Sequence, residues 1–469
     1  MPRYIFQLRN HQWLSPPQWK RQLLLWLGAV AVGLATTLFI KGCILAYATF
    51  HRVFAYGSWW PLVITPCMMA LLAYLTSGKL RATRGSGIPQ AIASLHIEDD
   101  KFRFSMLSLR IAVGKMALTL AALLGGASVG REGPTVHVGA SLMYSIGRRF
   151  GFAEPTAAGR FVLAGSAAGL AAAFNAPLAG VVFAIEEMAG AYENRMSGAI
   201  MTAVIIGGII TLGLLGNYSY FGTVHASLTI KQGWLAVLLC GGLCGMAGGL
   251  FSTIILLGGR VLSRVATLRA RWPVAFAFAC GLVLALIGIA SGNNVYGTGY
   301  DQARAIVQQA AVTPGASFGL AKLGANVVSY WAGIPGGIFS PALAVGAGLG
   351  QNIAHFLPGV PAAAVVLLGM SAYLSGVTGA PLTSAVIAME LTDNQSMVIP
   401  VMAACLLARA VSSLLSPTPV YKDFAERLVQ EFERQQAARH IPPEPVEHVG
   451  RSSAFDEPAA PADAPQEKP

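Results

Sequence analysis

The chain has 469 residues, of which 54% are hydrophobic and 11% are charged, and its formal net charge is +11. A soluble domain carries roughly 25% charged residues, so the composition argues against a soluble protein and indicates a membrane protein. The basic residues are spread over short loops and form no run with interleaved aromatic residues. We therefore expect no nucleic-acid partner.

Residues 1–21 are predicted to form a cytoplasmic N-terminal segment. They carry four Lys or Arg residues and no acidic one, and the apolar run that follows is too long for a cleavable signal peptide. A helix needs about 20 apolar residues to span a bilayer. Runs near this length occur at 23–40, 196–215, 233–258 and 273–290. They are continuous, not alternating, which predicts an all-α polytopic membrane protein.

Several other apolar segments are predicted to be short, about 10 to 14 residues, and broken by Gly and Pro. Such segments are tolerated in a membrane only where protein or an aqueous cavity surrounds them, and they are typical of transporter binding sites. They lie around 106–128, 134–147, 161–174, 341–352 and 362–377.

An internal repeat relates the two halves of the chain. PTVHVGASL from Pro134 matches PALAVGAGL from Pro341 at an offset of 207 residues. NAPLAGVVFAIEE from Asn175 matches GAPLTSAVIAMEL from Gly379 at an offset of 204. The halves are parallel or inverted according to how many times each crosses the membrane, and the broken segments leave that number open.

The repeat predicts the domain organisation. A first transmembrane repeat at 22–215 and a second at 231–425 are joined by a more polar linker at 216–230. Residues 426–469 are predicted to be a disordered, Pro-rich cytoplasmic tail, because they become Pro-, Ala- and Glu-rich with almost no large apolar residue.

Three glycine-rich stretches that contain proline interrupt the apolar sequence. They are RGSGIP from Arg84, GREGP from Gly130 and GGIFSP from Gly336. Each provides glycines for a sharp turn, followed by residues suited to starting a helix. A helix N-terminus presents unpaired N–H groups and the positive end of the helix dipole, which together form an anion site without a lysine. Ser86 adds a hydroxyl donor to the first stretch.

Four carboxylates lie within apolar sequence, where an ionisable residue costs roughly 2.5 to 3.5 kcal/mol at a helix centre. They are Glu132, Glu186, Glu187 and Glu390. Glu186 and Glu390 occupy equivalent positions of the repeat, and we expect them to serve helix ends or internal ion pairs. Lys115 is a candidate partner for charge balance, and we assign it no role in transport.

Cysteine and histidine give no sign of a metal site. The six cysteines lie in apolar segments, and Cys240 and Cys244 have no further Cys or His nearby to complete a set of metal ligands. We expect them to pack as small apolar residues. His137 and His355 are expected to be packed or interfacial. We expect neither a cofactor nor a metal ion.

The set GSGIP at 85–89, GREGP at 130–134, GGIFSP at 336–341 and the two A-P-L blocks resembles the CLC family of chloride channels and proton-coupled chloride transporters. The resemblance extends to about residue 425. It implies a homodimer in the inner membrane, with one pathway per subunit and both termini cytoplasmic. Each subunit would consist of two inverted halves of tilted, partly inserted helices. Longer members carry paired nucleotide-binding modules after the last helix, and we do not expect their regulation here.

The resemblance also implies roles for individual residues. Ser86 and the Tyr421 hydroxyl would contact a central anion, together with the backbone N–H groups of Ile338 and Phe339. Nitrate-preferring members have proline at the position of Ser86, so chloride is the expected anion. The fluoride-specific branch also departs from this GSGIP pattern.

Glu132 would be the external gate and proton acceptor, at a site formed with the backbone of Gly130, Arg131 and Glu132 itself. Its carboxylate would occupy an anion site when ionised and leave when protonated. Glu187 would transfer protons on the cytoplasmic side. Channel members have an apolar residue at this position, so Glu187 favours chloride/proton antiport. A passive chloride channel, or an antiporter for nitrate or fluoride, is the alternative.

An intramembrane enzyme that uses Glu132 or Glu187 as acid or base is a different class of function. The chain lacks the H-E-x-x-H and G-x-S-x-G patterns and paired intramembrane aspartates that such chemistry requires. We therefore expect a transporter of chloride and protons in contact with membrane lipid, and not an enzyme.

Overall fold

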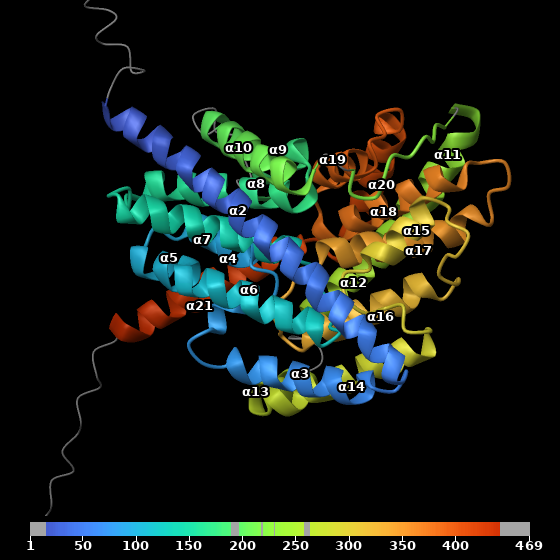
Figure 1. Ribbon diagram of the computed structural model, residues 1–469, viewed down its shortest axis with the longest axis horizontal. Coiled ribbons are helices and arrows are strands. Elements are labelled where there is room, and N and C mark those ends of the chain that lie inside the picture. The colour runs from blue at the N-terminus through green and yellow to red at the C-terminus, as the bar shows by residue number, and fades with distance from the viewer. Residues whose placement is uncertain (1–15, 189–196, 217–218, 229, 258–262, 441–469) are drawn as a thin grey trace, which may run out of the picture. The chain divides into compact units, whose positions relative to one another are not determined.

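The computed structural model describes residues 16–188, 197–216, 219–228, 230–257 and 263–440, and every regular element in these ranges is a helix (Figure 1). Residues up to Val429 form one compact unit, and Gln430 begins a second one. The prediction of an all-α protein is confirmed.

The first half of the chain contributes nine α-helices among the described residues. They are α2 (Pro16–Val53), α3 (Pro61–Leu75), α4 (Ile88–His96), α5 (Asp100–Leu107), α6 (Leu109–Leu124), α7 (Glu132–Arg149), α8 (Pro155–Phe174), α9 (Pro177–Phe183) and α10 (Ser197–Leu215). Short 3₁₀ turns, η2 (Phe54–Tyr56) and η3 (Arg81–Thr83), flank α3, and a π-helical turn, η4 (Ala184–Met188), extends α9.

The second half contributes the remaining helices of the described residues. Its helices are α11 (Ile230–Leu239), the π-helical turn η5 (Cys240–Cys244), α12 (Gly245–Leu257), α13 (Ser263–Arg271), α14 (Pro273–Ala290), α15 (Tyr300–Val307), α16 (Phe318–Trp331), α17 (Phe339–Ala354), α18 (Ala362–Thr378), α19 (Pro381–Thr392), α20 (Val398–Leu415) and α21 (Val420–His440). The pair α7 and α8 corresponds to α17 and α18, and both pairs pack closely.

Glycines let these equivalent helix pairs approach. A Cβ atom on Gly139 of α7 would lie 2.1 Å from the Gly165 carbonyl oxygen of α8, and the converse distance is 2.2 Å. At the equivalent positions, Gly346 of α17 and Gly369 of α18 would meet each other's carbonyl oxygens at 2.6 and 2.7 Å. Small residues at crossings are the usual means of close helix packing in membranes. The repeat read from the sequence thus extends to the packing contacts.

Six helical stretches among the described residues are long and apolar enough to cross a membrane. They are Trp19–Val53, Asp100–Leu124, Pro155–Phe174, Gly233–Leu256, Pro273–Ala290 and Val398–Leu415. The predicted run at 196–215 forms α10. The chain is an integral membrane protein.

The segments predicted to be only about 10 to 14 residues long form longer helices. α7 has 18 residues, α8 has 20, and α17 and α18 have 16 and 17. The prediction of their length was wrong because their ends are built from glycine, proline and polar residues, which apolarity does not count. Protein surrounds these ends: α8 is almost wholly buried from Phe161 onward.

Two predicted boundaries also differ from the structure. The polar linker at 216–230 is partly a core element, because Tyr220 and Phe221 are buried and the Phe221 N–H donates to the Leu391 carbonyl at 2.8 Å. Residues 426–440, predicted to be part of the disordered tail, continue α21 to His440. Their Glu, Gln, Arg and Ala residues are good helix formers. Residues 441–469 lie outside the described part.

Candidate anion and proton site

The three glycine-rich stretches each begin a helix, as the sequence predicted. α4 starts at Ile88 within RGSGIP, α7 starts at Glu132 within GREGP, and α17 starts at Phe339 within GGIFSP. Gly87 has a φ of 101°, which glycine adopts without strain, and a Cβ atom there would lie 2.5 Å from the His137 side chain. The turns before the helices are therefore specified by glycine.

Backbone hydrogen bonds join these stretches, although they are far apart in the sequence. The Gly130 N–H donates to the Gly337 carbonyl and the Gly337 N–H donates to the Gly130 carbonyl, both at 2.7 Å. The Gly336 N–H donates to the Gly85 carbonyl at 3.0 Å, and the Gly85 N–H donates to the Ile334 carbonyl at 3.2 Å. The beginnings of α4, α7 and α17 therefore meet at one place.

The Glu132 carboxylate lies against the N-terminus of α17. The Ser340 hydroxyl donates to its Oε1 at 2.5 Å, and the Ser340 backbone N–H lies 3.4 Å from its Oε2. The side chain is fully buried. A carboxylate here receives a hydroxyl, a helix N–H and the positive end of a helix dipole, which are the groups that bind an anion.

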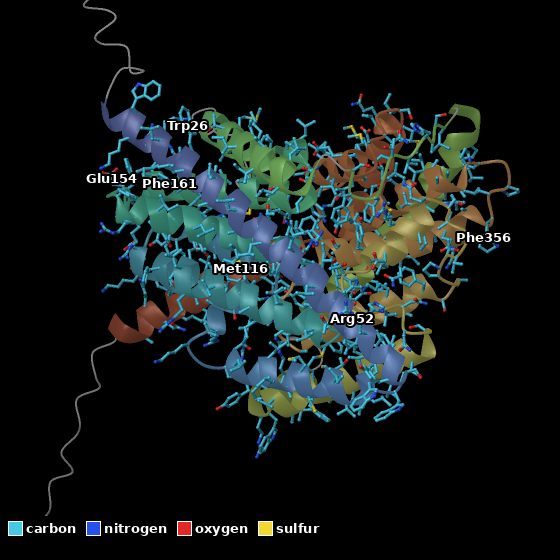
Figure 2. All side chains as sticks on the ribbon, in the orientation of Figure 1. Trp26, Arg52, Met116, Glu154, Phe161 and Phe356 are labelled. Carbon is cyan, nitrogen blue, oxygen red and sulfur yellow. The ribbon has the colours of Figure 1, made fainter. Side chains whose placement is uncertain are left out.

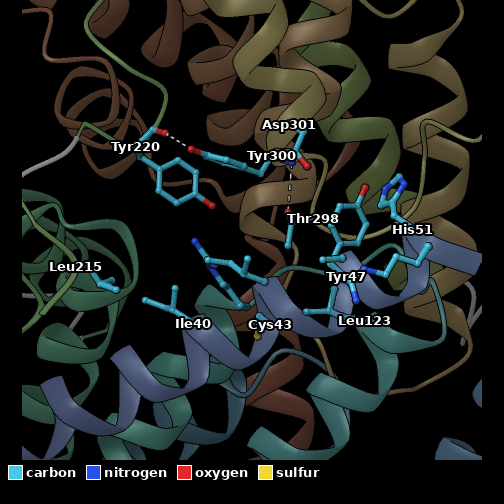
Figure 3. A pocket seen from close by; sticks show the side chains of 14 residues that line it. Ile40, Cys43, Tyr47, His51, Leu123, Leu215, Tyr220, Thr298, Tyr300 and Asp301 are labelled. Carbon is cyan, nitrogen blue, oxygen red and sulfur yellow. Dashed lines mark hydrogen bonds between the residues drawn. The ribbon is translucent and has the colours of Figure 1, made fainter.

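A chain of polar contacts leads from Glu132 to a cavity of about 770 Å³ (Figure 3). The Tyr220 hydroxyl lies 3.2 Å from the Ser340 hydroxyl, and the Tyr300 hydroxyl donates to the Tyr220 carbonyl at 2.9 Å. The Arg131 guanidinium lies 5.7 Å from the Tyr220 ring centre, and its Nε is 3.9 Å from Glu132 Oε1. Arg131, Tyr220 and Tyr300 line the cavity, together with His51 and other residues. The Arg131 side chain thus lies both against Glu132, where it was expected to balance local charge, and in the lining of the cavity.

Ser86 and Tyr421 come together on another side of these helix starts. Both hydroxyls are buried and make no hydrogen bond of ordinary geometry within the described residues, although they lie close enough to interact. Ser86 Oγ would lie 2.1 Å from a Cβ atom on Gly133, so this hydroxyl packs against the first turn of α7. The Tyr421 ring stacks on the Phe339 ring with centres 5.8 Å apart.

The backbone atoms named in the sequence analysis lie at the start of α17. Ile338 is the residue that caps this helix and Phe339 is its first residue. The first N–H groups of a helix have no acceptor within the helix. Two kinds of hydrogen-bond donor therefore lie in one region. They are the backbone N–H groups of Ile338 and Phe339 and the hydroxyls of Ser86 and Tyr421.

Glu187 lies in the π-helical turn η4 and is partly buried. The charged groups that act on it are Glu186 and Arg409. The Tyr421 phenol is in electrostatic range of both Glu187 and Glu132. Tyr421 is therefore a residue on which the two carboxylates of the predicted proton route both act.

Glu186 and Glu390 cap helices of the opposite repeat. Glu186 accepts from the backbone N–H groups of Leu382 and Thr383, at 3.0 and 2.6 Å, at the start of α19. Glu390 accepts from those of Leu178 and Ala179, also at 3.0 and 2.6 Å, at the start of α9. The expected helix-end role is confirmed. Such reciprocal contacts require the two halves to be related by an approximate two-fold axis.

Two buried lysines lie at equivalent positions of the two repeats. Lys115 donates to the carbonyls of Thr83 and Gly85 at 2.8 and 2.6 Å. Lys322, 207 residues further on, donates to the carbonyls of Val295 and Gly297, both at 2.8 Å, and to a serine hydroxyl. Lys115 therefore holds the loop before α4 through carbonyl groups. Among the described residues it pairs with no carboxylate, contrary to its predicted role in charge balance.

The remaining candidates are structural. His137 is buried with its Nε2 2.9 Å from the Met106 carbonyl, and His355 is exposed at the end of α17. Cys240 and Cys244 are buried thiols in η5. Within the described residues, no group of three or more His, Cys, Asp or Glu side chains is arranged to hold a metal ion.

Sequence reasoning missed two residues of the site. Ser340 belongs to GGIFSP, and its position directly before Pro341, in the first turn of a predicted helix, is the signal for a donor at that helix start. Tyr220 lies in the predicted linker, where no local pattern distinguished it from a surface tyrosine.

The fold and the site define an integral membrane protein of two repeats, in which glycine-rich helix starts and a buried carboxylate meet between the halves. The family model described as "Voltage gated chloride channel" matches residues 68–413. The chain belongs to this family, the CLC family.

Its relatives include proton/chloride exchangers. It is 31% identical over 400 residues to the H(+)/Cl(-) exchange transporter ClcA of Yersinia pestis, an alignment that covers 81% of this chain and 80% of the relative. It is 29% identical over 399 residues to the protein of the same name from Klebsiella pneumoniae, with 81% and 82% covered.

Solved structures share the fold. A CLC-type fluoride/proton antiporter superposes with a TM-score of 0.74 at 23% identity, covering 86% of this chain and 96% of that one. A slow cyanobacterial Cl-/H+ antiporter gives a TM-score of 0.71 at 24% identity, covering 88% and 99%. The CLC fold predicted from the sequence motifs is confirmed.

Proposed function

We propose that this protein exchanges chloride for protons across the cytoplasmic membrane, as a homodimer with one pathway in each subunit. The observation that carries the proposal is the Glu132 carboxylate at the N-terminus of α17, bound by the Ser340 hydroxyl at 2.5 Å and facing the Ser340 N–H at 3.4 Å. These groups favour any anion, so chloride and the ionised carboxylate compete for them. Protonation removes the negative charge and releases the side chain.

Chloride would bind beside this position, between the hydroxyls of Ser86 and Tyr421 and the N–H groups of Ile338 and Phe339. The support is chemical: two buried hydroxyls that lack a hydrogen bond of ordinary geometry to any described residue, and a helix start whose first N–H groups have no acceptor within the helix. Dipoles and hydroxyls bind an anion less tightly than a buried cation does, so the ion is released quickly.

Glu187 would deliver protons from the cytoplasmic side. Its partial exposure and the nearby Arg409 support an ionisable group that reaches both solvent and protein. Tyr421 lies within electrostatic range of both Glu187 and Glu132, so one residue would connect the anion and proton routes. The basic N-terminal residues favour cytoplasmic termini.

A flux assay in proteoliposomes tests the proposal. The full-length protein is reconstituted with a chloride gradient and no proton gradient, and proton movement is followed with a pH-sensitive dye. We expect uphill proton transport driven by chloride. Chloride flux without proton movement would establish a passive channel instead. Coupled transport with nitrate or fluoride but not with chloride would reassign the anion.

A further inference from the structure

A second cavity lies where α5, the start of α6 and the end of α7 meet, at the opposite end of α7 from Glu132. Its volume is about 800 Å³, and its charged lining residues are Asp100, Arg110, Arg148 and Arg149. The exchange mechanism uses none of them. Three arginines against one carboxylate leave an excess of positive charge in a single cavity.

One of these arginines is held in place. The Arg148 Nε donates to Asp100 Oδ2 at 3.0 Å, and its guanidinium lies 4.5 Å from the Phe104 ring centre. The Tyr144 hydroxyl donates to Asp100 Oδ1 at 2.5 Å, which fixes the carboxylate in turn. Arg148 is therefore oriented before any ligand arrives, which lowers the entropy lost on binding.

The other two arginines have no carboxylate partner within the described residues, since neither Arg110 nor Arg149 forms an ion pair there. Arg148 and Arg149 lie in the last turn of α7, where the negative end of the helix dipole stabilises a positive charge. Arg110 is the second residue of α6, where the positive end of the helix dipole destabilises a positive charge. Helix stability thus explains Arg149 but not Arg110, whereas an anion bound in the cavity would offset the positive charge of both.

Apolar residues exposed on the outer face of α6 continue from the cavity. Leu109 lines the cavity and is 52% exposed, and Val113, one turn further along α6, is 61% exposed. The cavity also lies at the N-terminal end of the candidate membrane span Asp100–Leu124. A phosphate bound to the arginines would therefore be followed, along α6, by a surface suited to acyl chains. Free phosphate has no apolar part, so this surface would add nothing to its binding.

The same end of the molecule carries other interfacial residues. The Lys20 ammonium at the start of α2 donates to the Phe150 carbonyl, just after α7, at 3.4 Å. Figure 2 shows Glu154, the residue before α8, at the outer edge of the helices on the side where α2 begins. Glu154 does not line the cavity, and among the described residues it forms no ion pair with the three arginines.

We propose that this cavity binds the phosphate headgroup of an anionic phospholipid, with Arg110, Arg148 and Arg149 as its ligands and the α6 face under the acyl chains. Basic cavities between membrane helices on the cytoplasmic side are suited to such headgroups. The proposal does not depend on the transport mechanism.

The test uses the full-length protein in a neutral detergent and measures lipid binding by native mass spectrometry. Phosphatidylglycerol is compared with phosphatidylcholine of the same acyl chains, and inorganic phosphate is added separately. We expect tighter binding of phosphatidylglycerol. Each arginine near a membrane surface contributes about fivefold, so Arg110→Gln/Arg149→Gln should weaken that binding about 25-fold. Lys79→Gln/Lys101→Gln removes two exposed charges that do not line the cavity and should change it little.

Three outcomes would overturn the proposal. Equal binding of the two lipids would remove the headgroup preference. Equal loss in both double variants would show general attraction to charge and not a site. Phosphate that displaces the lipid at equal concentration would show a site for the free anion only. Arg149→Lys keeps the charge and supplies a folded comparison: weakened binding there, with unchanged melting, supports recognition by the guanidinium.

Discussion

Gly130 and Gly337, at equivalent positions of the repeat, donate to each other's carbonyl oxygens at 2.7 Å. This mutual pair lies on the approximate two-fold axis that relates the halves, and it holds the starts of α7 and α17 together. Two helix dipoles thus direct their positive ends toward one region. Glu132 lies in that region, at the start of one helix and bound by the other.

Substitution of either glycine should disturb this geometry. A Cβ atom on Gly337 would lie 2.9 Å from the Gly133 nitrogen, and one on Gly130 would lie 2.6 Å from Glu132 Oε2. Such overpacking costs about 1 to 3 kcal/mol, so Gly337→Ala and Gly130→Ala should each lower chloride flux in proteoliposomes about tenfold. Gly213→Ala, where a Cβ atom meets nothing within 4 Å, is the matched control. Wild-type flux in both site variants would contradict the close approach.

Glu132→Gln should abolish proton movement and retain chloride flux. A neutral amide cannot carry the proton. Because the amide has no charge, the helix dipole of α17 does not hold it in the anion site, and chloride can pass. Flux of both ions in proteoliposomes measures the effect. Glu98→Gln replaces a carboxylate remote from the glycine-rich starts and should remain coupled. Proton pumping that persists in Glu132→Gln would refute the gate assignment.

Ser340→Ala should strengthen chloride binding. The hydroxyl bound to Glu132 Oε1 stabilises the carboxylate, and a hydrogen bond to a charged group contributes about 1.5 to 3 kcal/mol. Without it the carboxylate competes less well for the start of α17, so chloride affinity at the neighbouring site of Ser86 and Tyr421, which does not use the Ser340 hydroxyl, should rise about tenfold or more in calorimetry. Ser166→Ala, a buried serine that donates to the Val162 carbonyl, is the control. An unchanged affinity in Ser340→Ala would remove this residue from the gate.

Substitution of the adjacent residues Glu186 and Glu187 should have different effects, on protein stability in the first case and on proton/chloride coupling in the second. Glu186→Gln loses the charge that caps α19 and should destabilise the protein by about 1 to 2 kcal/mol while proton transport stays coupled. Glu390→Gln, its repeat equivalent at α9, should do the same. Glu187→Gln should uncouple proton from chloride flux and leave the melting temperature unchanged. If Glu187→Gln remained fully coupled, Glu187 would not lie on the proton route.

Lys322→Met should be strongly destabilising. It leaves the Gly297 carbonyl without its buried donor, which costs about 1 to 3 kcal/mol, and it removes a second hydrogen bond from the Val295 carbonyl and the Ser128 hydroxyl, which still bond to each other. Thermal melting in detergent checks this, with Lys101→Met on the exposed face of α5 as the control. A melting temperature equal to that of the control would show that the loop before α15 does not depend on the lysine.

The sequence was sufficient to predict the helix starts at all three glycine-rich stretches, because glycine permits a sharp turn and a following proline favours the first turn of a helix, whatever the rest of the fold. It also predicted the capping role of Glu186 and Glu390, because a repeat makes their equivalence visible. It did not predict the full lengths of α7 and α17. These helices include glycine and polar residues that only surrounding protein makes tolerable.

Tyr220 and Ser340 show a second limit. Their importance comes from contact with each other and with Glu132, and these three residues are separated by about 90 or more positions in the chain. No local pattern encodes that proximity. For the same reason, the carbonyl partners of Lys115 were not predicted, since the nearest of them, Gly85, is 30 residues away.

The exchange of caps between α9 and α19 has a consequence for the origin of the chain. Each half leaves the start of one helix to be closed by a glutamate from the other half, so neither half satisfies its own backbone. Two identical half-length chains, related by a two-fold axis, would make both contacts at once. A single half-length chain with this cap would therefore have the groups needed to assemble with its own copy, and duplication followed by fusion would preserve the arrangement. The later divergence that placed Glu132 in one half and Ser340 in the other then gave the fused chain an asymmetric site that a symmetric pair cannot have.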